Sequence, residues 1–181
     1  WPSEWAQEAN SQAIQILGGY GYTRDFPVEQ YWRDNRLNMI HEGTHGIQGL
    51  DLLGRKVLMN EGAALKALAA RIGETVTRAA SADTSLQSHG RALAAALQEV
   101  DAATRAAWAT GNPAEALANA TSYLQGFGHV VLAWIWLELA LAAQTANAGQ
   151  WPNGFLAGKR GACDYFFQYE LPKITPWLGV V

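Results

Sequence analysis

The chain has 181 residues, of which 49% are hydrophobic and 16% charged, a composition that excludes intrinsic disorder and suits one or two globular domains. A formal net charge of -3 gives no electrostatic reason to expect nucleic acid or an anionic membrane surface as a partner. Cys163 is the single cysteine, which excludes an intramolecular disulfide and a cysteine-based zinc site and fits a cytoplasmic location.

The first predicted helix covers residues 4–17, where apolar side chains recur every three or four residues on one face. These side chains are Trp5, Ala9, Ala13 and Ile16. Gly18 and Gly19 are typical helix stops, and residues 18–27 predict a structured loop. Because the chain opens on this helix with neither an initiating Met nor a signal peptide, we expect a fragment of a longer polypeptide.

A short second helix is predicted from Pro27, whose fixed φ suits the first turn of a helix. Glu29 and Arg33 have the i,i+4 spacing of an ion pair on that helix. Residues 37–43 are then expected to form a connector, and a third helix is expected to begin at Thr44 or His45.

From about residue 61 onward the sequence is alanine-rich and amphipathic, which predicts an antiparallel helical bundle. Its apolar stripes are Leu65, Leu68, Ile72 and Val76; Leu93, Leu97, Val100, Thr104 and Ala107; and Leu117, Ala120, Leu124, Phe127, Val131 and Trp134. Asn112 and Pro113 mark the start of the helix with the last stripe, and Gly126 and Gly128 are candidates for bending it. We therefore predict an all-α fold, with a helical segment over residues 1–60 and an additional helical domain over residues 61–181.

The most apolar run covers residues 130–137 and is stopped by Glu138, whereas about 18 to 20 apolar residues are needed to cross a bilayer. We expect a buried helix there and no membrane span. The aromatic tail, residues 151–181, is expected to fold back over the bundle.

The pentapeptide HEGTH, which begins at His41, fits more than one chemistry. As HExxH on a helix, both imidazoles would bind zinc and Glu42 would act beside a metal-bound water. Glu61 is a candidate third ligand, but it lies closer to His45 than that class of protease leads us to expect. Gly43 also disfavours the required helix by about 1 kcal/mol relative to Ala. The zinc hydrolase is therefore the remote alternative, and a simpler interpretation makes Glu42 a helix cap stabilised by the helix dipole.

The surrounding sequence favours a different chemistry. The run QILGGYGYTRDFPVEQ at residues 15–30, followed by RD at residues 33–34 and IHEGT at residues 40–44, closely resembles the C-terminal helical domain of acyl-CoA dehydrogenases. The continuation GIQGLDLLGRKV at residues 46–57 resembles the branch with an extra C-terminal helical domain, that of 3-methylmercaptopropionyl-CoA dehydrogenase. Residues from about 62 to 181 would be that added domain.

This resemblance implies an FAD-dependent oxidoreductase that removes two hydrogens from the α and β carbons of an acyl-CoA thioester. Its implied partners are electron-transfer flavoprotein or a similar acceptor, and its implied assembly is a homodimer or homotetramer. Glu42 would be the general base that takes the α-proton, and its own backbone N–H would be one donor to the enolate oxygen. His41 and Gly43 would lie at the substrate, although His41 fits a solvent-facing or core position equally well.

For the cofactor, the resemblance implies contacts from Gln15, Gly18 and Gly19 to the FAD of a neighbouring subunit. Glycine permits such an approach because it has no Cβ to hold a ligand away from the backbone. Thr44 would contact an FAD phosphate through its hydroxyl group. No metal ion is expected.

Two positions qualify the resemblance. Gly46 stands where many relatives carry Gln or Glu, so a side-chain contact to FAD is not expected there, and Gln48 matches a family glutamine that we interpret as structural. The parts that hold the flavin ring and most of the CoA in relatives would lie outside residues 1–181, so we expect this chain to be inactive by itself. The rival hypothesis is a non-catalytic helical module for oligomerisation or docking.

Overall fold

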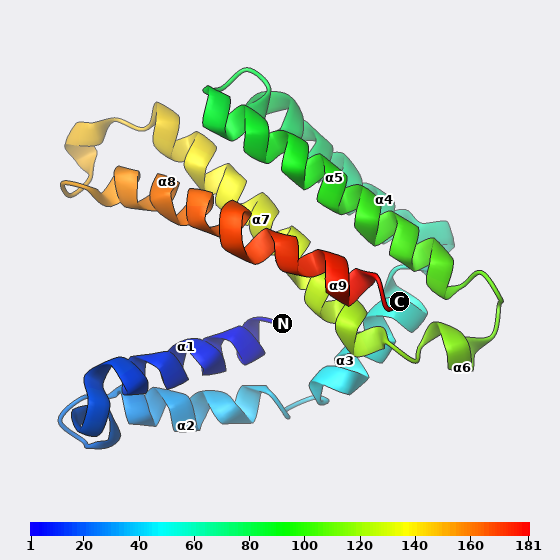
Figure 1. Cartoon of the computed structure of the whole chain (residues 1–181), viewed down its shortest axis with the longest axis horizontal. Coiled ribbons are helices and arrows are strands. Elements are labelled where there is room, and N and C mark those ends of the chain that lie inside the picture. The colour runs from blue at the N-terminus through cyan, green and yellow to red at the C-terminus, as the bar shows by residue number, and fades with distance from the viewer. The chain divides into compact units, whose positions relative to one another are not determined.

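The computed structural model describes residues 1–147 and 149–181, and its regular secondary structure is helical throughout (Figure 1). No strand occurs within these described residues, which confirms the all-α prediction. Contacts divide the chain into two compact units, Trp1–Gly49 and Leu50–Val181.

The first unit contains α1 and α2, and α3 crosses the division between the units. Their bounds are α1 Pro2–Leu17, a 3-10 helix Gly18–Tyr22, α2 Val28–Asn38 and α3 His45–Asp51. The second unit contains the longer helices. Their bounds are α4 Met59–Ala79, α5 Thr84–Ala107, α6 Pro113–Ala116, α7 Ala120–Thr145, α8 Phe155–Tyr165 and α9 Ile174–Leu178, with π-helical turns at Leu52–Lys56 and Phe166–Glu170.

Helices α1 and α2 form a hairpin that polar contacts and a glycine hold together. The Asn35 side-chain amide donates to the Ser3 carbonyl at 2.9 Å and to Gln7 Oε1 at 3.0 Å. At the turn, a Cβ on Gly21 would lie 2.6 Å from the Ile14 carbonyl oxygen, so only glycine allows this approach. The predicted apolar face of α1 is not the face buried here, because Ile16 is 84% exposed.

The features predicted around α2 lie within one residue of their predicted positions. Pro27 lies directly before α2 and not within its first turn, and its carbonyl accepts from Tyr31 N at 3.1 Å. The predicted pair on α2 forms, with Arg33 Nε 3.4 Å from Glu29 Oε2. The predicted loop at residues 18–27 is structured, as expected, and begins with a 3-10 helix.

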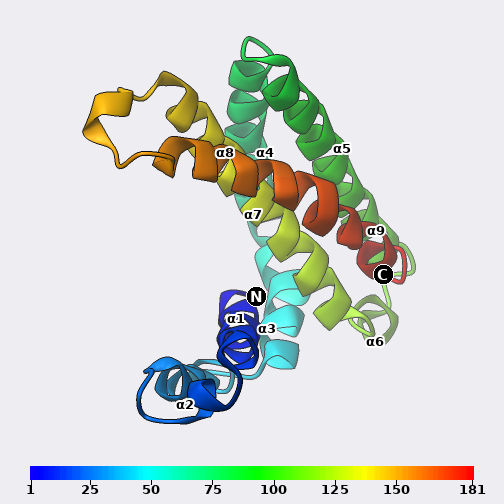
Figure 2. The same cartoon turned by 60° about the vertical axis from the view of Figure 1, so that its left-hand side comes forward.

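The second unit is built around α7, against which α4, α5, α8 and α9 pack (Figures 1 and 2). The predicted stripes of α4 and α5 face its core, where Ile72 and Leu93 are fully buried and Val100 nearly so. Asp83 caps α5 by accepting from Leu86 N at 3.1 Å. Removing such side chains from water supplies the main stabilising free energy of a helical bundle.

The start of the central helix differs from the prediction. Asn112 caps a helix as expected, accepting from Ala114 N at 3.1 Å, but this helix, α6, ends at Ala116. Helix α7 starts afresh at Ala120, so Leu117 lies outside it. The side chains of α7 that are most deeply buried also differ from the predicted stripe after Ala120. They are Ala120, Tyr123, His129, Val130, Ala133, Leu137 and Ala140.

Gly126 provides close packing within α7, which runs without interruption from Ala120 to Thr145. A Cβ on Gly126 would lie 2.7 Å from Leu178 Cδ2, so the glycine lets α9 approach α7.

Helix α7 is long and apolar enough to cross a membrane by length and composition alone. In the structure, 39% of its most apolar 18-residue window is buried inside the bundle.

The tail packs back onto α7, as predicted. Cys163, Phe166 and Phe167 are buried in the shared core. Burial raises the pKa of the Cys163 thiol to about 12. Trp151 and Phe155 remain more exposed and stack on each other with ring centroids 4.9 Å apart.

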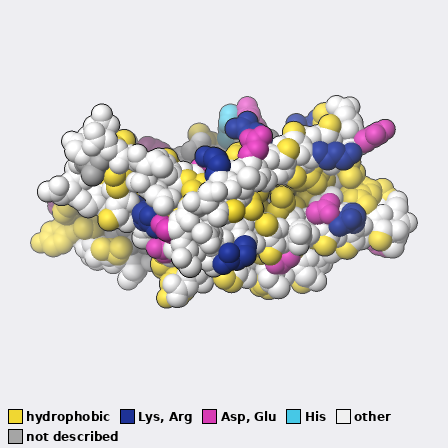
Figure 3. All heavy atoms as spheres, turned by 90° about the horizontal axis from the view of Figure 1, so that it is seen from above, with side chains coloured by type: hydrophobic (Ala, Val, Ile, Leu, Met, Phe, Trp, Pro, Cys, Tyr) yellow, Lys and Arg dark blue, Asp and Glu magenta, His cyan; other side chains and the backbone are white. Residues whose placement is uncertain are grey.

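In the face shown in Figure 3, charged side chains are scattered, and a hollow is lined mainly with hydrophobic ones. A hydrophobic groove between α4 and α5 is lined in part by Leu65, Ala69 and Leu97.

The start of α4 is not regular helix. Asn60, Glu61 and Gly62 have φ values of 50°, 56° and 78°, so right-handed helix begins only after them.

Candidate functional site

The HEGTH segment lies in the connector between α2 and α3. Helix α2 ends at Asn38, and the predicted third helix begins at His45, one of the two positions expected. The connector therefore starts at Met39, two residues later than predicted. The His41 N–H still donates to the Leu37 carbonyl at 2.9 Å, which ties the connector to the end of α2.

Glu42 has an unusual backbone conformation within this connector. Its φ is 58°, in the left-handed region that costs a residue with a Cβ about 1–2 kcal/mol. The next residue, Gly43, has a φ of 121°, which favours glycine. A Cβ on Gly43 would also lie 3.0 Å from Ile47 Cγ2, so the connector folds closely over the first turn of α3.

Gln48 joins α3 to this strained residue. Its side-chain amide Nε2 donates to the Glu42 carbonyl oxygen at 3.1 Å, and its backbone N–H donates to the Thr44 carbonyl at 3.0 Å. A neutral hydrogen bond contributes about 0.5–1.5 kcal/mol net, which is comparable with the strain at Glu42. Gln48, interpreted from the sequence as structural, thus makes a specific contact with the backbone of the candidate base.

His45 anchors the other side of the connector. Its Nε2 lies 3.3 Å from Ser3 Oγ, its Nδ1 lies 3.4 Å from Glu4 Oε2, and its side chain is only 19% exposed. Because Ser3 and Glu4 form the first turn of α1, the start of α3 is fastened to that turn. Sequence reasoning missed this contact because no local periodicity links residues about 40 positions apart.

The geometry does not match an HExxH zinc site. Such a site needs both imidazoles on one face of a helix, whereas residues 41–44 are not helical. His41 is 69% exposed, and His45 is directed to α1. Within residues 1–147 and 149–181, no group of three or more His, Cys, Asp and Glu side chains could hold a metal ion.

The carboxylate of Glu42 is open to its surroundings, with 84% of its side chain exposed. His41 Nε2 lies 3.9 Å from Glu42 Oε1, so the imidazole is the nearest titratable neighbour that the structure gives this carboxylate. Thr44, also exposed, directly precedes α3. Residues 41–44 thus carry an exposed acid and an exposed hydroxyl on either side of the half-buried Gly43.

The predicted cofactor residues Gln15, Gly18 and Gly19 lie at the opposite end of the α1–α2 hairpin from Thr44 (Figure 1). The 11 residues of α2 separate the two ends by about 16 Å at 1.5 Å per residue. All three are exposed, and no atom lies within 4 Å of a Cβ built on Gly18 or Gly19. The φ of Gly18 is 60°, a conformation that favours glycine. At position 19, neither the backbone conformation nor a neighbouring atom requires glycine.

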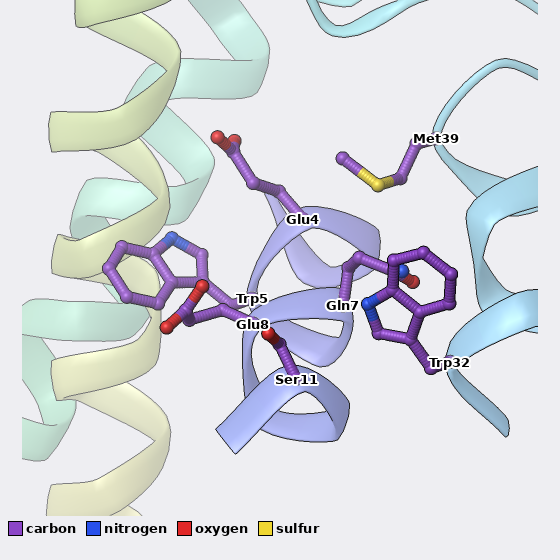
Figure 4. Close-up of a pocket in the computed structure, with 7 residues that line it drawn as sticks. All are labelled: Glu4, Trp5, Gln7, Glu8, Ser11, Trp32 and Met39. Carbon is purple, nitrogen blue, oxygen red and sulfur yellow. The ribbon is translucent and has the colours of Figure 1, made fainter. Parts of the chain in front are cut away.

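A hollow lies along α1 and α2, at the connector end of the hairpin (Figure 4). It is lined by Glu4, Trp5, Gln7, Glu8, Ser11, Trp32 and Met39. None of the predicted site residues lines it, and Glu4 is its link to the connector through His45.

Two family models cover most of the chain. One, described as the acyl-CoA dehydrogenase C-terminal domain, matches residues 1–58, and the other, described as acetyl-CoA dehydrogenase C-terminal like, matches residues 68–181. The chain belongs to the acyl-CoA dehydrogenase family. The resemblance seen in the sequence is thereby confirmed.

Individual members of the acyl-CoA dehydrogenase family match along nearly the whole chain. The broad-specificity linear acyl-CoA dehydrogenase FadE5 of Mycobacterium tuberculosis is 31% identical over 99% of this chain and 31% of its own length. The 3-methylmercaptopropionyl-CoA dehydrogenase of Ruegeria pomeroyi is 33% identical over 96% of this chain and 30% of its own length. The chain thus spans about a third of these relatives.

A shorter match is found with the short-chain specific acyl-CoA dehydrogenase of Clostridium acetobutylicum, which is 44% identical over 28% of this chain. The family thus includes members that match this chain over a short stretch and members that match both of its helical parts. Family membership leaves the roles of single residues to be argued from their geometry.

Proposed function

We propose that this chain is the C-terminal part of an FAD-dependent enzyme that dehydrogenates an acyl-CoA thioester between its α and β carbons. Residues 61–181 would be the additional helical domain. The observation that carries the proposal is the placement of Glu42, exposed and in a left-handed conformation, directly before Gly43 and Thr44. Membership of the acyl-CoA dehydrogenase family supports an acyl-CoA thioester as the substrate.

Glu42 would take the α-proton, since an α-proton of a thioester is only weakly acidic and needs a positioned carboxylate. The backbone N–H of the same residue would donate to the enolate oxygen, which carries the negative charge that develops. One strained residue would then fix the direction of both groups. Efficient proton transfer also needs water excluded, and with 84% of the Glu42 side chain exposed, groups outside this chain would have to cover it.

The exposed glycines of the first unit fit the approach of a large planar cofactor. Gly19 has open space where a Cβ would stand, and no backbone strain explains a glycine there. Gln15 and Gly18 would join Gly19 in contacting FAD of a neighbouring subunit, while Thr44 would contact FAD phosphate at the other end of the hairpin. Bound FAD would supply the hydride acceptor for the β carbon. His41 and Gly43 would border the acyl thioester.

A contact of Gln15, Gly18 and Gly19 with the FAD of a neighbouring subunit would require a homodimer or homotetramer. Electron-transfer flavoprotein or a similar acceptor would reoxidise the flavin. The enzyme would act in the cytoplasm, where the single buried thiol is compatible with a reducing environment.

The decisive variant is Glu42→Gln in the full-length enzyme, which keeps the side-chain size and removes the base. Turnover of acyl-CoA is expected to fall by at least about 100-fold, since general-base catalysis contributes about 10²–10⁴-fold, while bound FAD stays unchanged. Glu61→Gln is the matched control, because the zinc hypothesis needs Glu61 and the dehydrogenase does not. Full turnover in Glu42→Gln would reject the assignment of the base.

The purified chain of residues 1–181 tests the second part of the proposal. We expect it to be colourless and unable to reduce an electron acceptor with acyl-CoA. A yellow preparation with turnover would show that these residues suffice for catalysis. If the full-length protein contained no flavin and only assembled into oligomers, the non-catalytic module would replace the enzyme as the better hypothesis.

A further inference from the structure

Gln48 makes a contact that the proposed chemistry does not yet use. Its side-chain amide donates to the carbonyl of Glu42, six residues earlier, at 3.1 Å. The same Nε2 atom lies 3.2 Å from the position that a Cβ on Gly43 would occupy. The amide therefore lies directly against the two residues that give the connector its left-handed conformation.

Little else in the local chain would hold Glu42 in that conformation. A residue with a Cβ prefers negative φ, and the glycine that follows permits many alternatives. A contact to the Glu42 carbonyl acts at the peptide group next to the strained Cα, so its loss would free the connector to relax. The base would then leave its position without any change in its own side chain.

Helix α3 gives Gln48 a fixed support. The Gln48 N–H closes the first turn of α3 on the Thr44 carbonyl at 3.0 Å, and His45 fastens the start of α3 to Ser3 and Glu4. Ile47, beside it, lies 3.0 Å from the Cβ position of Gly43. The donor is thus held on a helix, whereas its acceptor is in a connector.

We infer that Gln48 is a positioning residue, which holds the backbone of Glu42 so that its carboxylate and its N–H stay aligned with the substrate. This inference rests on the proposed function, because it acts through Glu42 as the base. Gln48 touches neither the substrate nor the reacting atoms in this role. The chemistry needs a side-chain donor of this length, and an amide provides it without a charge.

The test is Gln48→Met in the full-length enzyme, a change that nearly preserves length and removes the donor. The kcat is expected to fall about 10- to 100-fold, because small misplacements of a catalytic group have effects of that size. The KM, the FAD content and the melting temperature are expected to stay close to those of the unchanged enzyme. The NMR or crystal structure of the variant should show Glu42 leaving positive φ.

The matched control is Gln12→Met. Gln12 is an exposed glutamine on α1 whose Nε2 also donates to a neighbour, Glu8 Oε1, at 2.7 Å, so the control repeats the chemical change away from the connector. Unchanged kcat in Gln48→Met would overturn the inference. So would a fall in kcat matched by equal losses of FAD and thermal stability, which would mark a merely structural role. Full turnover in Glu42→Gln would instead overturn the proposed function, and the positioning role with it.

Discussion

The two units of the chain differ in where they place their apolar side chains. All hydrophobic residues that are buried in the described structure, from Leu53 to Leu178, belong to the second unit. The first unit buries Gln7, Gly21 and Gly49, and it exposes Ile16 and Tyr22 by more than four fifths. The second unit therefore has the core that stabilises a fold, whereas the first displays the conformations and side chains suited to chemistry.

The comparison predicts its largest contrast between two truncations of aliphatic side chains. Leu93→Ala is expected to lower the free energy of unfolding by about 2–5 kcal/mol, because Leu93 is fully buried and its loss leaves a cavity. Ile16→Ala is expected to change it by less than about 0.5 kcal/mol. Urea denaturation of the chain, followed by circular dichroism, measures both. Equal losses would mean that Ile16 is buried in solution.

A second contrast lies within the second unit, between glycines with and without a packing role. Gly126→Ala is expected to destabilise the chain, since forcing Leu178 aside costs about 1–3 kcal/mol and exceeds the gain in helix propensity of about 1 kcal/mol. Gly73→Ala on α4 meets no atom within 4 Å and should stabilise by up to about 1 kcal/mol. Melting temperatures that shift in the same direction would contradict the close approach of α9.

The smallest expected effect is on pH dependence. His129 on α7 is 1% exposed, and burial lowers its pKa below the ordinary value of 6.5, although Glu170, at 3.6 Å, opposes the shift and Lys173 adds to it. The unfolded chain therefore binds a proton at His129 more readily than the folded chain does. The contribution of neutral His129 to stability is fully present above about pH 6.5 and is lost as the pH falls toward the lowered pKa. The titration of one proton can change the free energy of unfolding by no more than about 1.4 kcal/mol per pH unit.

The control for this pH dependence comes from the first unit. His129→Gln should flatten the dependence of the unfolding midpoint on pH between 7 and 5. His41→Gln should leave it unchanged, since His41 is 69% exposed. An identical slope in the unchanged chain and in His129→Gln would show that another group titrates.

The sequence predicted the elements wherever a local signal decides the conformation. The glycines after Leu17 end α1, and Asn112 with Pro113 begins α6, because caps and stops act over a few neighbouring residues. The stripe on α7 was harder to predict, since nearly every face of that helix is apolar. Its neighbours α4, α5, α8 and α9 decide which residues are buried.

The site shows the same division between local and distant causes. The place of Glu42 in a connector followed from Gly43 and from the family motif. Its positive φ, its contact with Gln48 and the anchoring of His45 to Ser3 did not, because they depend on how the connector folds over α3 and α1. Periodicity carries no information about contacts of that kind.

The burial of Cys163 has a practical consequence. Thiol reagents react with the thiolate, and a thiol with no exposed surface and a pKa raised to about 12 should be inert to maleimides at neutral pH. A cysteine introduced at an exposed position such as Ser88 would then be the one group that takes up a fluorophore or a spin label. Spectroscopic probes could be attached to the native background without first removing any natural residue.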